Sequence, residues 1–358
     1  MRNSQLLTAV FLPAALLVGC GQGQPEAEVS ATELQQMEEG LITTSTPQRL
    51  ATLEGGGAMR MGTTHIYFVD YENRAIRRVP KAGGAVETVF SAPSDAWILS
   101  EFALDDQYVY AAVVEGPNYF GHIVRVPLAG GEPVVLLDGE MSYGAIAVDA
   151  THVYLGYLDW QIIGSGPASQ LVRFPKDGSI FLEPEVIASE QNNVSSIAVD
   201  GSNVYWIDAG GLNPANGCNP NEGKIRAWNK LSKATRIIAS GENCPLNLVF
   251  DGSTLYWGNF AYELRKISAW SYFGFPQTVA RDVNGLAIAA DSSYLYAETG
   301  SGQPYLMAVG KLFGTRYSFS NTRGEREFYG LAADTQNLYY LRYDGSEGPR
   351  SSLFKLRK

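Results

Sequence analysis

The stretch Ile197-Ala198-Val199-Asp200, with Tyr205 five residues after the Asp, decides the fold of this 358-residue chain. It is a short apolar strand that ends in Asp, and other segments share the same spacing. A degenerate copy has Gly62 in place of the Asp, followed by Tyr67. Self-similarity of this kind indicates a repeat architecture. The other five Asp–Tyr pairs are Asp105–Tyr110, Asp149–Tyr154, Asp251–Tyr256, Asp291–Tyr296 and Asp334–Tyr339.

The seven copies recur every 40 to 51 residues, which is the length of about one four-stranded propeller blade. The first unit reads as strands over 59–61, 66–70, 76–80 and 86–90, with a Gly-Gly turn before the last strand. These observations predict an all-β fold, a β-propeller of seven blades rather than six or eight.

The two ends of the domain predict how the ring closes. The seventh unit stops after its third strand, near Leu356, while Arg49–Leu53 precedes the first unit and reads like a spare fourth strand. If this N-terminal strand completes the last blade, no sheet edge is left exposed. Deleting residues 46–54 should then destabilise the whole domain.

A family resemblance follows from Val204-Tyr205-Trp206-Ile207-Asp208 after the repeated Asp, and more weakly from Ile66–Asp70. Both segments resemble the YWTD repeats of low-density lipoprotein receptor propellers. The resemblance implies the propeller fold over most of residues 56–358. The chain departs from that family because it has seven units rather than six and keeps the Asp after the aromatic pair in only two copies. Because of these departures, the resemblance implies no receptor function.

The N-terminal residues have the pattern of a targeting signal. An apolar run from Leu6 to Val18 follows Arg2 and leads into Gly19-Cys20, which resembles the lipobox of bacterial lipoproteins. The resemblance implies a signal peptide over 1–19, a lipid on Cys20 and an outer-membrane anchor that faces the periplasm or the cell surface. The alternative is an ordinary secretory signal with a chance Cys. Residues 20–47 are predicted to be a flexible tether, and 48–358 the propeller domain.

Composition excludes several function classes. The 37 acidic residues outnumber the 27 basic ones, for a net charge of −10, so a nucleic-acid partner is not expected. Three His and three Cys argue against His-rich metal sites and zinc ribbons. The repeated Asp is predicted to cap a tight turn rather than to hold a ring of calcium ions. Third-strand basic residues are predicted to lie on a solvated outer face: Arg78, Arg125, Arg173, Arg226 and Arg265.

Long connections fall on one predicted face of the ring, at 115–121, 158–169, 209–222 and 343–351. Insertions confined to one face of a repeat protein mark a binding face, although surface loops also tolerate insertions without function. Aromatic residues interleaved with Asn suit a protein or glycan partner. The candidate binding residues are Asn118, Tyr119, Phe120, Trp160, Asn213, Asn216, Asn219 and Asn221.

Cys218 and Cys244 are predicted to form a disulfide. Cys218 lies in the long connection of the fourth unit and Cys244 in the next link between units, so both belong to the same face. An exported protein meets an oxidising compartment, and Cys20 is taken by lipid. The alternative, a metal or redox pair, lacks a CxxC motif.

Two function hypotheses remain. The first is a monomeric, lipid-anchored, non-catalytic scaffold that binds a protein or glycan and needs no cofactor. The second is a propeller hydrolase or lyase that resembles the lactonase type, in which Asn and carboxylate oxygens hold a divalent ion such as Ca²⁺ at the channel mouth. Its candidate ligands are Asn192, Asn243, Asn259 and Asn284.

Overall fold

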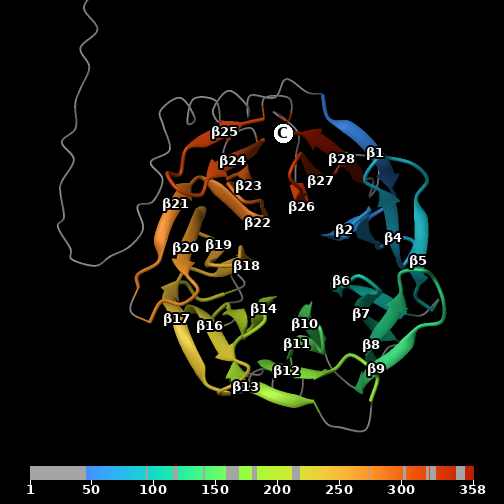
Figure 1. Ribbon diagram of the computed structural model, residues 1–358, viewed down its shortest axis with the longest axis horizontal. Coiled ribbons are helices and arrows are strands. Elements are labelled where there is room, and N and C mark those ends of the chain that lie inside the picture. The colour runs from blue at the N-terminus through green and yellow to red at the C-terminus, as the bar shows by residue number, and fades with distance from the viewer. Residues whose placement is uncertain are drawn as a thin grey trace, which may run out of the picture. The chain divides into compact units, whose positions relative to one another are not determined.

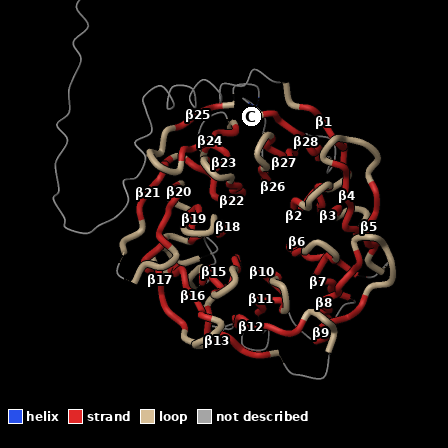
Figure 2. The backbone as a smooth tube through the Cα atoms, in the orientation of Figure 1, coloured by secondary structure: helices blue, strands red, loops and turns tan. Residues whose placement is uncertain are grey.

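Seven four-stranded antiparallel sheets follow one another around a ring (Figures 1 and 2). We number these blades 1 to 7 along the chain. The computed structural model describes residues 46–358 except 94–95, 116–119, 140–141, 159–168, 180–183, 212–217, 273, 301–303, 320–321, 323–327 and 344–350. Within the described residues there is no α-helix, and so none that could cross a membrane. The predicted all-β seven-bladed propeller is confirmed.

Each blade uses its strands in the same order from the centre of the ring to its rim (Figure 1). The first strands are β2 (Gly56–Met61), β6 (Ala96–Leu104), β10 (Ser142–Val148), β14 (Val194–Val199), β18 (Pro245–Phe250), β22 (Val283–Ala290) and β26 (Phe328–Ala333). The second strands are β3 (His65–Asp70), β7 (Tyr108–Glu115), β11 (His152–Leu158), β15 (Asn203–Asp208), β19 (Thr254–Asn259), β23 (Tyr294–Thr299) and β27 (Asn337–Tyr343).

The outer half of each blade completes the sheet. The third strands are β4 (Ala75–Pro80), β8 (Phe120–Pro127), β12 (Ser169–Pro175), β16 (Gly223–Asn229), β20 (Glu263–Ser268), β24 (Leu306–Gly310) and β28 (Ser351–Arg357). The fourth strands are β5 (Glu87–Ser91), β9 (Val134–Gly139), β13 (Glu185–Gln191), β17 (Thr235–Glu242), β21 (Gln277–Arg281), β25 (Arg316–Ser318) and, for blade 7, β1 (Gln48–Leu53).

The N-terminal strand closes the ring as predicted. β1 pairs antiparallel with β28, with Gln48 opposite Lys355 and Leu53 opposite Ser351. Leu50 and Leu53 are buried in the seam between blades 7 and 1. The last sheet is therefore built from both ends of the domain, so separating the ends requires breaking a complete strand ladder.

The hydrophobic core is divided among the seven seams between neighbouring sheets. Each seam holds one cluster of buried apolar side chains, such as Tyr205, Ile225 and Trp257 between blades 4 and 5. Ala residues of the first strands belong to these clusters, for example Ala103 and Ala289. Small side chains suit the inner end of a seam because the sheets converge toward the axis of the ring.

Antiparallel pairing fixes two faces of the ring. The turns between first and second strands and between third and fourth strands lie on one face, which we call the turn face. The connections between second and third strands and the links from blade to blade lie on the other, which we call the loop face.

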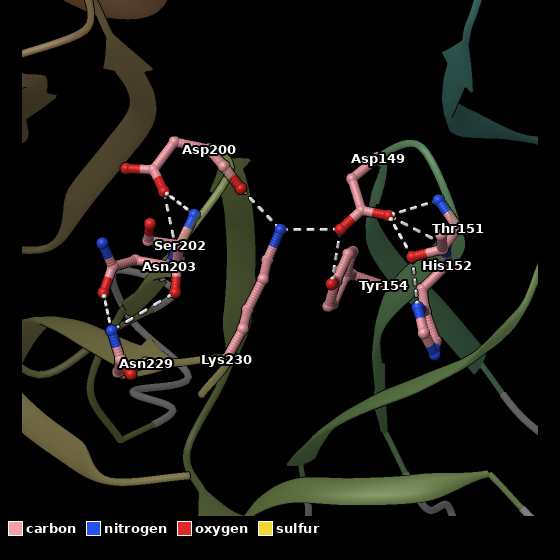
Figure 3. Close-up of polar contacts among 9 residues, drawn as sticks. All are labelled: Asp149, Thr151, His152, Tyr154, Asp200, Ser202, Asn203, Asn229 and Lys230. Carbon is pink, nitrogen blue, oxygen red and sulfur yellow. Dashed lines mark hydrogen bonds and ion pairs between the residues drawn. The ribbon is translucent and has the colours of Figure 1, made fainter. Parts of the chain in front are cut away.

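The repeated Asp closes its own turn on the turn face (Figure 3). Asp149 Oδ1 accepts backbone N–H bonds from Thr151 and His152 at 2.7 and 2.8 Å, and its Oδ2 accepts the Tyr154 hydroxyl at 2.7 Å. The backbone part of this pattern recurs at all six repeated Asp residues. The predicted turn-capping role is confirmed, and the pair explains the constant five-residue spacing.

A Lys from the next blade joins four of these turns to their neighbours. Lys230 Nζ of blade 4 lies 2.6 Å from Asp149 Oδ2 of blade 3 and also donates to the Asp200 carbonyl oxygen (Figure 3). At the junction of blades 1 and 2 both partners are missing, because Gly62 replaces the Asp and Leu128 the Lys. The other three bridges are Lys176–Asp105, Lys311–Asp251 and Lys358–Asp291.

Candidate binding face

The loop face carries the predicted binding residues that the structure describes. Asn219 and Asn221 follow residues 212–217 of the blade 4 connection, which lie outside the described structure, and directly precede β16. Phe120 begins strand β8 rather than lying in a loop, and its side chain is outside the described structure. The remaining candidates lie outside the described residues: Asn118, Tyr119, Trp160, Asn213 and Asn216.

The two described Asn residues differ in role. Asn219 donates from its backbone N–H to the Gly211 carbonyl at 2.7 Å and from Nδ2 to Glu222 at 3.1 Å. The same Glu222 carboxylate accepts the Gly211 N–H at 3.1 Å. Asn219 therefore ties the two ends of this loop together. Asn221 is exposed and adopts a left-handed φ of 64°, a conformation that Asn tolerates better than most residues.

The predicted disulfide is present. It joins Cys218 in this loop to Cys244 in the link between blades 4 and 5, with a Cα–Cα distance of 6.0 Å, and both cysteines are buried. The 26-residue separation means that the bond spans the outer two strands of blade 4. The loop is thus fastened to the neighbouring blade at its base.

Buried ion pairs support the loop face from below. Asp70 at the end of β3 is completely buried and lies 3.0 Å from Arg77, and it also holds Asn73 in the following turn. Asp208, which occupies the same position in blade 4, pairs with Arg226 at 3.5 Å. Such carboxylates are costly to bury unless they are paired. These are the two Asp residues of the YWTD-like segments, so their role here is to brace the strand ends.

The prediction that the third-strand basic residues lie on a solvated face is wrong for Arg125, Arg226 and Arg265, whereas Arg78 and Arg173 pair with exposed glutamates. Arg226 and Arg265 face the loop side, where Arg265 pairs with buried Glu242 at 3.1 Å. Arg125 donates to the carbonyl of Lys176 in the next blade. Adjacent positions on a strand point to opposite sides. Basic residues one position apart in the third strands therefore make two different kinds of contact, which the sequence pattern does not distinguish.

Two exposed aromatic residues extend this surface and were not predicted. Phe260 and Tyr262 lie in the short connection of blade 5, and each is about half exposed. The Phe260 N–H donates to the Asn243 carbonyl at 3.1 Å, beside Cys244. Tyr262 has a left-handed φ of 56°, which is unfavourable for an aromatic residue. Its ring lies where a side chain on Gly300 would be, so that glycine makes room for it.

The four Asn residues of the metal alternative make local contacts. Asn259 Oδ1 accepts the Glu263 N–H at 3.0 Å, and Asn284 binds Glu298 at 2.8 Å. Asn192 donates its backbone N–H to Asp208, and the carbonyl of Asn243 accepts from Phe260. Among the described residues, no group of three or more His, Cys, Asp or Glu could hold a metal ion. The side-chain oxygen of Asn259 is engaged in its own turn, and that of Asn284 accepts the Leu286 N–H at 3.1 Å within β22.

The central channel contains an ion pair between Arg60 of β2 and Glu101 of β6. A cavity of about 190 Å³ lies here, lined also by Ser195, Ser196 and Asn247. Small-molecule sites are commonly about 300–1,000 Å³, so this space is small for a substrate pocket. The sequence did not identify this pair, since inner-strand polar residues can face either the channel or a seam.

A second cavity, of about 480 Å³, lies between blades 1 and 2 near the rim. It is lined mostly by apolar residues together with His122, whose Nδ1 is 2.9 Å from Asp138. Ser91 also lines it. His122 and Asp138 therefore form a pair beside this cavity.

Comparison with known proteins supports the fold alone. The chain matches no protein-family model and no curated protein. It is similar to a chain in a crystal structure of a nidogen/laminin complex, with a TM-score of 0.52 and 20% identity over 75% of this chain and 97% of that one. The WD40 repeats of RRP9 give a TM-score of 0.63 with 10% identity, covering 89% and 99%. A streptogramin B lyase gives 0.60 with 9% identity, covering 89% and 96%.

Proposed function

We propose that this protein is a lipid-anchored, extracytoplasmic, non-catalytic scaffold that binds a partner protein through the loop face of blades 4 and 5. The observation that carries the proposal is the disulfide-fastened connection of blade 4 beside exposed Phe260 and Tyr262. Rigidly presented aromatic side chains are the residues that most often anchor protein interfaces. The anchor is the lipid on Cys20 in a bacterial outer membrane.

The support for binding over catalysis comes from how the polar groups are used. The carboxylates beneath the loop face form ion pairs with Arg77, Arg226 and Arg265. Those pairs hold strand ends and leave a firm platform for the exposed aromatic residues. A chain of a nidogen/laminin complex and a streptogramin B lyase are both similar in fold. The preference for binding over catalysis therefore rests on these contacts and not on the comparisons.

The test of the interface is site-specific photo-crosslinking in cells of the source organism. A photoreactive amino acid at Phe260 should give a discrete protein adduct, whereas one at Tyr71, an exposed aromatic residue on the loop face of blade 1, should not. The double change Phe260→Ala and Tyr262→Ala should reduce recovery of the same partner at least tenfold with an unchanged unfolding midpoint. Undiminished recovery, or an adduct that is a glycan, would overturn the protein-binding proposal.

The test of the anchor is separate. Replacing Cys20 with Ser should release the protein from the membrane fraction and remove the lipid mass from its N-terminal peptide. If the parent chain carries no lipid on Cys20, attachment through this residue is wrong, and the interface can still be judged from the crosslinks.

A further inference from the structure

Among the described residues, six large apolar side chains stand exposed in the turns between third and fourth strands of blades 4, 5 and 6, on the turn face. Their exposed fractions run from 56% to 93%. Contiguous exposed apolar groups of this size on a soluble domain usually mark a contact surface. We call them the apolar tips: Leu231, Trp270, Tyr272, Phe275, Leu312 and Phe313.

The three turns hold the tips outward through their own hydrogen bonds. In blade 4, Asn229 Oδ1 accepts the N–H groups of Leu231 and Ser232 at 3.2 and 2.9 Å. In blade 5, Arg236 donates to the carbonyls of Ala269 and Ser271, and its guanidinium lies 5.0 Å from the Tyr272 ring. The backbone is already satisfied, so the exposed side chains are not required to close these turns.

The blade 6 turn is built in the same way. Gly314 donates to the Gly310 carbonyl at 2.9 Å with a φ of 68°, and Gly310 donates to the Thr315 carbonyl at 2.8 Å. Leu312 and Phe313 lie at the tip of this closed turn. Three successive blades thus present apolar groups from ordered turns.

Together, the three apolar turns contain basic residues but no acidic ones, although the chain as a whole is acidic. The segments 230–236, 269–277 and 311–316 contain five basic residues and no acidic one. Lys230 and Lys311 neutralise Asp149 and Asp251 of the repeat, and Lys233 lies 3.1 Å from Glu185. Arg236 and Arg316 lie at the base of the apolar turns. Aromatic and aliphatic tips bordered by Lys and Arg match the interface of an anionic bilayer.

The N-terminal strand enters the ring on this same face. Gln48, the first residue of β1, pairs with Lys355 close to Lys358. Lys358 bonds to Asp291 in the first turn of blade 6, on the turn face. Only 27 residues separate Cys20 from Gln48, and a flexible segment of that length spans about 30 Å on average. Because the chain enters the ring from the turn face, an anchor at Cys20 favours membrane contact by this face.

We propose that the turn face of blades 4 to 6 rests on the membrane surface, with the apolar tips inserted among the headgroups of anionic phospholipid. The proposal rests on the N-terminal attachment proposed above. It goes beyond that attachment because it fixes the orientation of the ring: the loop face points away from the bilayer toward its partner. The position of the N-terminal strand and the absence of acidic residues in the three turns favour lipid over a protein at this patch.

The experiment uses the full chain bound to protein-free vesicles of phosphatidylethanolamine and phosphatidylglycerol. An environment-sensitive dye is attached to Cys in Phe275→Cys, in Phe313→Cys and, as the matched control, in Phe260→Cys on the loop face. The parent chain is labelled in parallel to account for Cys20. All three sites are exposed, so the substitutions leave the fold intact.

At positions 275 and 313 we expect a blue-shifted emission that brominated lipid quenches severalfold more than at position 260. If the chain floats with the vesicles but all three dyes report water, attachment stands and the proposed face contact is wrong. If the chain does not float, both fail. Shielding of 275 and 313 in native membranes but not in protein-free vesicles would assign the patch to a protein partner and also overturn the proposal.

Discussion

The turns between third and fourth strands differ between blades 1 and 2 on one side and blades 4–6 on the other, although both sets occupy the same place in the repeat. In blades 1 and 2 the turns use glycine in the left-handed region, at Gly83 and Gly130, and expose no large apolar side chain. In blades 4–6 the turns are braced by Asn229, Arg236 or a glycine bond and carry the apolar tips. The difference is confined to the turn tips.

What does not differ is the residue that follows each third strand. In all seven blades its backbone N–H donates to the carbonyl two residues beyond the repeated Asp position, as Lys176 does to Thr151 and Ala269 to Ser253. This bond fixes where the turn starts and leaves its tip free to vary. The comparison teaches that the apolar tips of blades 4–6 are not a requirement of the fold.

The largest loss of stability should come from removing strand β1. This deletion tests whether the two halves of the ring, blades 1–3 and blades 4–6, form one cooperative unit. Deleting residues 46–54 removes buried Leu50 and Leu53, worth together about 3–6 kcal/mol, and exposes the edge of β28. Blades 1–3 and 4–6 should then lose stability together in urea, seen in one transition. A deletion of equal length between residues 22 and 45 is the control and should change nothing.

A two-step transition after this deletion, with one half still folded, would contradict the single-ring description. It would also mean that blades 4–6 are a separate platform, and the comparison would then be between two domains.

Removing the disulfide should have the next largest effect, and it acts only in the half that carries the apolar tips. The change Cys218→Ser with Cys244→Ser frees a loop of 26 residues, which costs about 3.5 kcal/mol on the chain-entropy account. Urea unfolding of the parent and the double variant measures it. Equal stability of the two proteins, or an equal loss from Cys20→Ser, would show that the bond does not stabilise the ring.

The sequence predicted the fold well because its signals are local and repeated. The Asp–Tyr spacing reflects a turn that six of the blades close with their own Asp, and a hydroxyl bond to that Asp, as in blades 2, 3 and 4. Arg49–Leu53 was recognisable as a strand because one blade lacked its fourth. The disulfide followed from the faces on which Cys218 and Cys244 fall.

The site was predicted less well because it depends on where neighbouring side chains point. The sequence pattern predicted that Arg226 and Arg265 face solvent, because it does not show that Asp208 and Glu242 lie beside them. Phe260 was not predicted because it lies in a short connection, and the binding residues were sought in the long insertions. Leu312 and Phe313 precede Gly314, which suits a turn. Periodicity cannot show, however, that an apolar residue in a turn stays exposed.

The repeated Asp turns should contribute equally in the two halves, which a pair of substitutions can test. Burial alone would raise the pKa of Asp251, but the Lys311 ammonium and two backbone N–H groups lower it to about 2. A lowered pKa stabilises the folded state above the unfolded pKa of 3.8, and the contribution is lost as the pH falls through about 2. Asp251→Asn should cost about 1 kcal/mol at neutral pH, the scale of a solvent-screened ion pair.

The matched change in the other half is Asp105→Asn, which breaks the same bridge to Lys176. Urea titrations between neutral pH and pH 2 should show both variants losing less stability on acidification than the parent protein does. A large loss for one variant and none for the other would mean that the halves also differ in their scaffold, and not only at the turn tips.

The smallest change in stability should come from the substitutions with the clearest effect on membrane contact. Changing Leu231, Phe275 and Phe313 to Ser alters only exposed side chains, so the free energy of unfolding should stay within about 0.5 kcal/mol of the parent value. Quenching of Trp270 by brominated lipid should nevertheless fall severalfold, because the neighbouring tips no longer favour insertion. The control changes Val134 and Val135 to Ser at the start of β9, directly after the blade 2 turn, and should leave both measurements unaltered. A stability loss above about 1 kcal/mol in the triple variant would show that the tips pack against the ring, and the contrast between the two sets of turns would then be structural rather than functional.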